Sequence, residues 1–279
     1  MPGALLSYLA PSVGVFTCVS DGYDDQDQEL IGQAIHQAGS QFTHLTFVTP
    51  DSAIDSPALS AVVEYLIKIS GERGALHTLA DVDEIDPAFE VLRNSSFATY
   101  SRQRVWQLEI NDHSNDQRNW RVARNTDGNA IRALYRNLVP GMVQQVDPFN
   151  LDEPDGLVHY QGEELLAYAE LKYGHRGIWV QPLVHPDTVD VAQKLENLVA
   201  TMPYRRSRPV YFSVRTYQSW LENALAELGA EAGTSRALMV KHLAITQKAV
   251  LSYELPAIEG RQPEITTSIV NTPNQGEGN

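Results

Sequence analysis

Apolar and polar residues along the chain follow two periods, and their alternation predicts strands separated by amphipathic helices. Runs rich in β-branched and aromatic residues predict the strands. Leu59, Val62, Val63 and Leu66 recur at helical spacing and place one apolar stripe on a helix. The segment 30–36 fits either a strand or a helix. In the first part of the chain we therefore expect strands at 13–19, 43–48, 76–82 and 97–108, and helices at 57–70 and 87–94.

The second part of the chain repeats this alternation after additional opening elements. Thr126 or Asp127 is expected to cap a helix that Pro140 and Gly141 end, and Asp187 is expected to cap a later helix. A turn at 161–163 joins two strands into a hairpin. The pattern predicts strands at 120–123, 156–160, 164–173, 178–184, 209–214 and 237–243, and helices over 131–138, 189–200 and 217–228.

Short matches at a nearly constant spacing relate the two parts. The segment 48–51 (VTPD) is matched by 184–187 (VHPD), and 101–102 (SR) by 235–236. The same order of helix, strand, helix and strand follows each first match, which indicates an internal duplication. Residues 111–117 contain no apolar residue and mark the boundary, so we expect domains at 1–116 and 117–250. The Pro, Gly and polar composition of 251–279 predicts a disordered tail.

This order of elements resembles the GNAT superfamily of N-acyltransferases, which take their acyl group from an acyl-coenzyme A. The second part covers the whole order of the family, whereas the first part lacks the opening strand and helices. The most specific shared feature is the Val-x-Pro-Asp ending of the central strand. The resemblance implies an α/β fold with a mixed, twisted sheet, built from two GNAT-like units in tandem. It also implies acetyl-CoA as the cofactor.

The resemblance further implies where the coenzyme would bind. The central strand of the family is splayed by a bulge, and its free backbone N–H groups bind the cofactor there. Pro182 in the strand 178–184 fits such a bulge, or an edge strand. The pyrophosphate lies at the N-terminus of the next helix, where free N–H groups and the helix dipole favour an anion. In this chain the implied cofactor-binding positions are Gln181, Leu183, Val184, Val189, Asp190, Val191 and Ala192.

The pyrophosphate loop departs from the family pattern, which reads Arg or Gln, two residues, Gly, one residue, and Gly or Ala. Val189 stands at the Arg or Gln position, and Asp190, Ala192 and Lys194 stand at the glycine-type positions. The corresponding loop of the first part, 53–58, has no glycine either. Glycine lets the backbone approach a phosphate closely, and a carboxylate repels one. Weak or absent coenzyme binding is therefore compatible with this loop.

The acid of the family is also missing. Many members use a Tyr in the last helix to protonate the departing thiolate, but Leu225 and Leu92 stand at that position in the two parts. Leucine cannot transfer a proton. Tyr211 and Tyr217 are either substitutes for it or ordinary packing residues. Two carboxylates remain either candidate general bases or surface charges: Glu170 and Glu222.

Composition and charge narrow the classes of partner. The chain has 279 residues and a net charge of −14, so the phosphate backbone of a nucleic acid would be repelled. The single cysteine, Cys18, excludes an internal disulfide and suits a cytoplasmic protein. The eight histidines show no ligand spacing for a metal site. The apolar runs are too short for a transmembrane helix.

Two functions remain open from the sequence. The first is transfer of an acyl group from acetyl-CoA to an unknown amine. The second is a catalytically silent GNAT-like module that binds a ligand or a protein partner. The family resemblance favours the first, and the altered loop and missing tyrosine favour the second.

Overall fold

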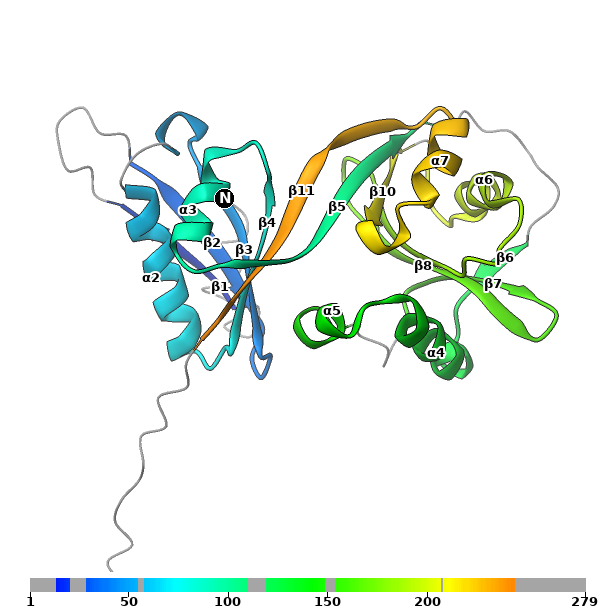
Figure 1. Cartoon of the computed structure of the whole chain (residues 1–279), viewed down its shortest axis with the longest axis horizontal. Coiled ribbons are helices and arrows are strands. Elements are labelled where there is room, and N and C mark those ends of the chain that lie inside the picture. The colour runs from blue at the N-terminus through cyan, green and yellow to red at the C-terminus, as the bar shows by residue number, and fades with distance from the viewer. Residues whose placement is uncertain are drawn as a thin grey trace, which may run out of the picture. The chain divides into compact units, whose positions relative to one another are not determined.

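The computed structural model describes residues 14–20, 29–54, 58–109, 119–148, 154–206 and 208–243. The predicted boundary at 111–117 and the tail at 251–279 lie outside the described residues. The described strands form one mixed sheet of eleven strands, in the order β1-β2-β3-β4-β11-β5-β10-β9-β8-β7-β6. Figure 1 shows β5 and β11 as the long strands in the middle of this sheet. The expected mixed α/β fold is confirmed.

The first half, residues 14–109, follows the predicted pattern closely. Segment 30–36, which fits either period, is mostly strand. Asp86 caps the helix that begins at Pro87, because the Asp86 side chain accepts the N–H of Ala88 at 2.8 Å. The elements are β1 (Val15–Val19), β2 (Ile31–His36), β3 (Phe42–Thr49), a 3-10 turn (Asp51–Ala53), α2 (Ala58–Glu72), β4 (His77–Asp83), α3 (Pro87–Asn94) and β5 (Ala98–Leu108).

The second half, residues 119–243, contains every predicted strand. It also contains one helix, α5, that the sequence pattern did not predict, because Pro140 and Gly141 end one helix and begin another. The elements are β6 (Trp120–Val122), a 3-10 turn (Asn125–Asp127), α4 (Gly128–Leu138), α5 (Gly141–Val146), β7 (Gly156–Gln161), β8 (Glu164–Tyr173), β9 (Ile178–Val184), α6 (Val191–Thr201), β10 (Val210–Arg215), a 3-10 turn (Thr216–Gln218), α7 (Leu221–Glu227) and β11 (Glu231–His242).

The helix starts of the second half differ from expectation. The side chain of Asp127 does not cap α4; its carboxylate instead binds Arg121 and the N–H of Arg124. The helix expected to begin at residue 189 begins at Val191, and its N-cap is Asp190 rather than Asp187. Neither helix start therefore has a side-chain capping hydrogen bond.

The last strands of the two halves are exchanged at the centre of the sheet. Strand β5 of the first half lies between β10 and β11, and β11 of the second half lies between β4 and β5. Along the β5–β11 ladder, Gln103 is opposite Arg236 and Arg102 is opposite Ala237. Arg102 and Arg236, the arginines of the two matched segments, therefore stand at adjacent positions across this ladder.

Helices cover both faces of the sheet in the second half. On one face α6 and α7 bury Leu195, Leu198 and Leu225 against the strands. On the other face α4 and α5 bury Ile131 and Val143, and they pack on alternate strand residues. In the first half α2 and α3 cover β2 and its neighbours. Each half therefore has its own hydrophobic core, and the exchanged strands join the two.

The packing of α2 on β2 requires a glycine. A Cβ on Gly32 would lie 2.4 Å from Val62 Cγ1 and 2.9 Å from Leu66 Cδ1. These two residues belong to the apolar stripe that predicts α2, and both are buried. The close approach of helix and strand thus depends on the missing side chain at position 32.

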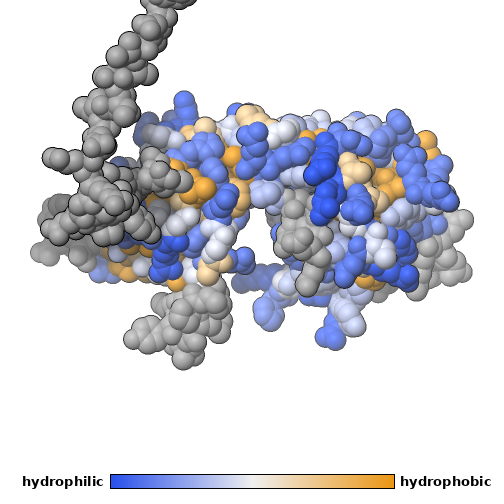
Figure 2. All heavy atoms as spheres, turned by 90° about the horizontal axis from the view of Figure 1, so that it is seen from below, coloured by the Kyte–Doolittle hydropathy of each residue, from blue (hydrophilic) through white to orange (hydrophobic). Residues whose placement is uncertain are grey.

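The face shown in Figure 2 is mostly hydrophilic, with smaller hydrophobic patches between. Large hydrophobic side chains that are exposed include Phe47, Ile85 and Val189. Among the residues that the structure describes, no helix combines the length and apolar character needed to cross a membrane.

Candidate functional site

Two neighbouring strands of the second half diverge where the family resemblance places the coenzyme. Strands β9 and β10 are parallel and pair from Ile178–Val210 to Val180–Phe212. Beyond this last pair, both strands continue without facing each other. The divergence leaves the backbone groups of the last β9 residues without a partner strand on the β10 side.

The side chain of Gln218 occupies this divergence. Its Oε1 accepts the backbone N–H of Val184 at 2.9 Å, and its Nε2 donates to the carbonyl of Pro182 at 2.9 Å. Gln218 lies in the 3-10 turn after β10 and is 1% exposed. A side chain of the protein itself therefore satisfies the two strand groups that would be free for a ligand.

Pro182 lies neither at an edge nor at a bulge, in contrast to expectation. Strand β9 is interior, and Pro182 is opposite Ala169 in a β8–β9 ladder without a register shift. The carbonyl of Pro182 faces Gln218, and the N and C=O of one strand residue point to the same side. The missing N–H therefore also faces the divergence, where no ladder bond is lost.

The structure distributes the seven predicted cofactor-binding residues over three environments. Leu183 and Val184 are buried, and the N–H of Val184 is bonded to Gln218. Val189 and Asp190 are exposed in the turn before α6. Gln181 is half-buried on β9, and the other two lie in the first turn of α6 against the core: Val191 and Ala192.

The start of α6 does not fit a pyrophosphate. Asp190 adopts a left-handed conformation with φ of 53° and places a carboxylate at the helix N-terminus. The N–H of Lys194 is bonded to the Asp190 carbonyl at 3.0 Å, and the Lys194 amino group donates to the carbonyl of Val189. The lysine that could attract a phosphate is thus engaged with the backbone, while the carboxylate remains exposed.

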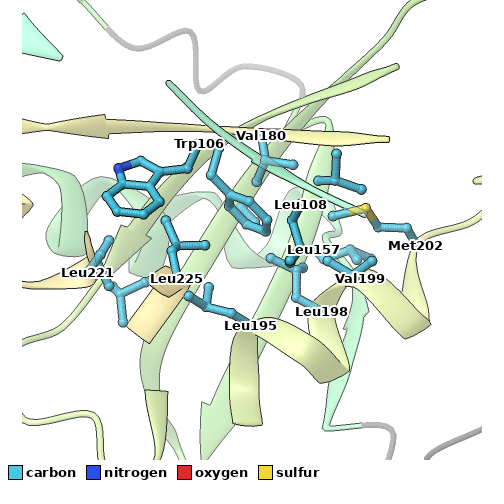
Figure 3. Close-up of a cluster of buried hydrophobic side chains, with 14 of the residues drawn as sticks. Trp106, Leu108, Leu157, Val180, Leu195, Leu198, Val199, Met202, Leu221 and Leu225 are labelled. Atoms are coloured by element: carbon cyan, nitrogen blue, oxygen red, sulfur yellow. The ribbon is translucent and has the colours of Figure 1, made fainter. Parts of the chain in front are cut away.

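The residue at the position of the family tyrosine belongs to the hydrophobic core. Leu225 is fully buried and lies among Leu221, Leu195 and Trp106 (Figure 3). The nearby Tyr217 is a poor proton donor, because burial raises its pKa to about 12. Leu225 thus packs α7 onto the sheet and has no proton to transfer, and Tyr217 is a weaker acid than a free tyrosine.

The two candidate general bases are both paired with cations. Glu222 accepts from Arg104 at 2.7 Å, and Glu170 lies 3.4 Å from the amino group of Lys172. From the sequence, each of these glutamates was either a general base or a surface charge. Their ion pairs give each carboxylate a structural partner.

The corresponding strands of the first half also diverge, and here a cavity remains open. Strands β3 and β4 pair from Phe42–His77 to His44–Leu79, and a cavity of about 200 Å³ lies beyond. Gln218 follows the last β9–β10 pair by six residues, and the residue six positions after Leu79 is Ile85, which is 82% exposed and does not line the cavity. The walls are apolar, from β3, β4, α2 and α3, and the polar lining carries four carboxylates and one arginine: Asp51, Asp81, Asp83, Asp86 and Arg236.

The charge of this cavity is unfavourable for a coenzyme. Arg236 is already paired with Asp81 at 2.9 Å, which leaves three carboxylates without a lysine or arginine in the lining. The sequence pattern placed the ligand in the second half and did not predict this cavity. The sequence feature that could have indicated the cavity is the group of acidic residues at the end of β4: Asp81, Asp83 and Asp86.

Acetyl-CoA therefore does not fit the residues at either divergence in the manner that the resemblance implies. One opening is filled by Gln218, and the other is lined by carboxylates. Among the described residues, no three His, Cys, Asp or Glu side chains are grouped to hold a metal ion.

Models of known protein families and sequences of curated proteins give no match to this chain. Solved structures do resemble it. A GCN5-related N-acetyltransferase from Sphaerobacter thermophilus aligns with a TM-score of 0.51 at 10% identity, over 80% of this chain and 82% of that one. A tandem GNAT protein from the clavulanic acid biosynthesis pathway aligns with a TM-score of 0.50 at 12% identity, over 83% and 84%.

A GCN5-related N-acetyltransferase from Kribbella flavida aligns with a TM-score of 0.50 at 12% identity, over 85% of this chain and 94% of that one. The chain thus has the GNAT fold, as the order of its elements predicted. At 10–12% identity this likeness shows the fold and does not show the activity.

Proposed function

We propose that this protein is a ligand-binding module with the GNAT fold that does not transfer acyl groups from acetyl-CoA. The observation that carries the proposal is Gln218, whose side chain takes the N–H of Val184 and the carbonyl of Pro182. An acyl donor at this place would have to displace a buried side chain and replace both hydrogen bonds. Leaving either backbone group unpaired costs about 1–3 kcal/mol.

Two further features support this proposal. Asp190 opposes a pyrophosphate at the start of α6, and Leu225 replaces a proton donor with a core residue. Each feature acts on a different step of acyl transfer: cofactor binding for Asp190 and leaving-group protonation for Leu225. A single substitution would therefore not restore the reaction.

The open cavity of the first half is the better place for a ligand, and its lining favours a cation. Its apolar walls suit a short hydrocarbon body, and its carboxylates suit an ammonium group. We therefore propose a small amine with an apolar body as the ligand class.

We also infer from the equivalent strands and registers that the two halves arose by duplication and that only the first kept this opening.

The alternative function is acyl transfer from acetyl-CoA to an amine, the type of activity that the solved N-acetyltransferases above are named for. It would require Gln218 to leave the divergence when the coenzyme binds.

Calorimetric titration of the full chain with acetyl-CoA separates the two functions. The proposal predicts no saturable heat, whereas 1:1 binding in the micromolar range would establish the acyl-donor site and overturn it. A parallel titration with phenethylamine tests the cavity. Asp83→Asn and Asp51→Asn should weaken amine binding several-fold, and Glu163→Gln, an exposed carboxylate on the β7–β8 turn, should leave it unchanged.

A further inference from the structure

A second cavity, of about 230 Å³, lies where strands of both halves meet, and its lining differs in character from the first. Trp179, Gln181 and Arg215 line it, whereas their neighbours Val180 and Val214 belong to the core under α6 and α7. The cavity therefore opens on the opposite face of the sheet. Its charged lining residues have both signs: Asp81, Asp147, Lys172 and Arg215.

Arg215 is the unusual residue of this cavity. It is 7% exposed, and its Nη2 donates to Asp147 Oδ2 at 3.0 Å. Its Nε and Nη1 are buried and have no hydrogen-bond partner. Nearly all buried polar groups in proteins are paired, and an unpaired donor on a charged group is costly. Two such donors on one guanidinium that lines a cavity point to an acceptor that the chain does not supply.

The carboxylates of the cavity do not accept from Nε or Nη1 of Arg215, and both have other donors. Asp147 already accepts from Arg215 Nη2 and from the Tyr100 hydroxyl at 3.4 Å. Asp81 accepts from Arg236 at 2.9 Å and from Gln103 at 2.9 Å. The unpaired donors of Arg215 are thus left for a molecule that enters the cavity.

We propose that this cavity binds a small carboxylate, one oxygen of which accepts from an unpaired donor of Arg215. The guanidinium is a permanent cation, and its hydrogen bond to a carboxylate is charge-assisted. Asp147 and Asp81 are each paired with an arginine, Arg215 and Arg236, which reduces their repulsion of a carboxylate. His44 and Tyr100 complete the lining as neutral groups, because burial lowers the pKa of His44 and raises that of Tyr100.

This inference does not rest on the proposed function, because it needs neither the coenzyme nor the amine cavity of the first half. A failed acetyl-CoA titration leaves it intact, and failed carboxylate binding leaves the reasoning on Gln218 intact. The two sites also prefer ligands of opposite charge, so their titrations report separately.

The test is titration of the full chain with benzoate and succinate, with benzamide and succinamide as neutral controls. The carboxylates should bind saturably and the amides should not. Arg215→Met should weaken carboxylate binding at least tenfold. Arg104→Met is the matched control, because Arg104 also lies in the central strands but pairs with Glu222. That variant should stay within twofold of the parent chain.

A second measurement covers the case in which Arg215→Met does not fold. In ¹⁵N-labelled parent protein, the Arg215 side-chain Nε–H resonance should shift on addition of benzoate and not of benzamide. Saturable binding together with this shift supports the site. Absence of saturable binding by both carboxylates, or binding that a folded Arg215→Met variant retains in full, overturns the proposal.

Discussion

Gln218 Oε1 accepts the backbone N–H of Val184 at 2.9 Å across the divergence of β9 and β10. The Nε2 of the same side chain donates to the carbonyl of Pro182, so one amide forms hydrogen bonds with both backbone groups of the diverging strand. In this half of the molecule the two strands diverge as in the GNAT fold, but the free backbone groups of β9 are hydrogen-bonded to a side chain of the protein itself.

Removing the Gln218 amide should destabilise the protein. Gln218→Ala and the nearly isosteric Gln218→Met both leave Val184 N–H and Pro182 C=O unpaired, at a cost of about 1–3 kcal/mol. The exchange of the Val184 amide with solvent should become faster in both variants. Chemical denaturation and amide hydrogen exchange measure the two effects. Gln161→Ala, at the exposed end of β7, should change the free energy of unfolding by less than about 0.5 kcal/mol.

Restoring a tyrosine at position 225 should harm the fold rather than create an enzyme. Leu225 is fully buried, so Leu225→Tyr forces a larger, polar side chain into the core at a cost of about 1–3 kcal/mol. Leu225→Met conserves volume and should cost less than about 1.5 kcal/mol. Thermal unfolding measures both, and equal stability of the tyrosine variant would show that the site has room for a proton donor.

Acid should weaken the protein partly through Asp127. Two hydrogen bonds from Arg121, each 2.7 Å, hold the pKa of the Asp127 carboxyl well below its usual range. A depressed folded-state pKa stabilises the protein above the unfolded pKa of about 3.9, and this stabilisation is lost as the pH falls through the folded value.

Asp127→Asn should therefore lose about 1–3 kcal/mol at neutral pH and approach the parent protein below about pH 4. Denaturant unfolding across a pH series measures the difference. A constant gap between the two proteins at all pH values would exclude this linkage. Glu163→Gln should follow the parent curve throughout.

The contact of α2 with β2 gives a prediction about packing. Gly32→Ala should destabilise the first half by about 1–3 kcal/mol, because its Cβ would overlap Val62 Cγ1. Gly141→Ala is the control, since nothing lies within 4 Å of its Cβ position. In a double-mutant cycle, Gly32→Ala should cost less in a Val62→Ala background than in the parent protein, and an equal cost in both backgrounds would rule out the steric cause.

Much of the fold could be predicted from the sequence because its elements carry strong local patterns. The stripe of Leu59, Val62 and Leu66 identified α2, and the β-branched runs identified the strands. Helix starts were less predictable. Asp127 stands at the N-cap of α4 but its side chain makes no capping hydrogen bond, and the N-cap of α6 is Asp190 rather than Asp187. The early start of β11 at Glu231 was missed, because pairing with β5 stabilises polar residues that carry no strand pattern.

The site was harder to predict than the fold, because it depends on contacts between distant residues. The sequence showed that the loop before α6 lacked glycine and that Leu225 replaced a tyrosine. It gave no sign that Gln218 would fold back onto Val184, 34 residues away, since a glutamine after a strand has many possible partners. The exchange of β5 and β11 was equally hidden, because both strands keep the same local pattern in either arrangement.

The backbone amide of Val184 provides the most direct test of the central claim, that Gln218 closes the acyl-donor position. In ¹⁵N-labelled full-length protein titrated with acetyl-CoA, this resonance should stay unchanged and its exchange with solvent should stay slow at every coenzyme concentration. A saturable shift of the Val184 amide, with loss of its bond to Gln218, would contradict the account and place an acyl donor at this strand.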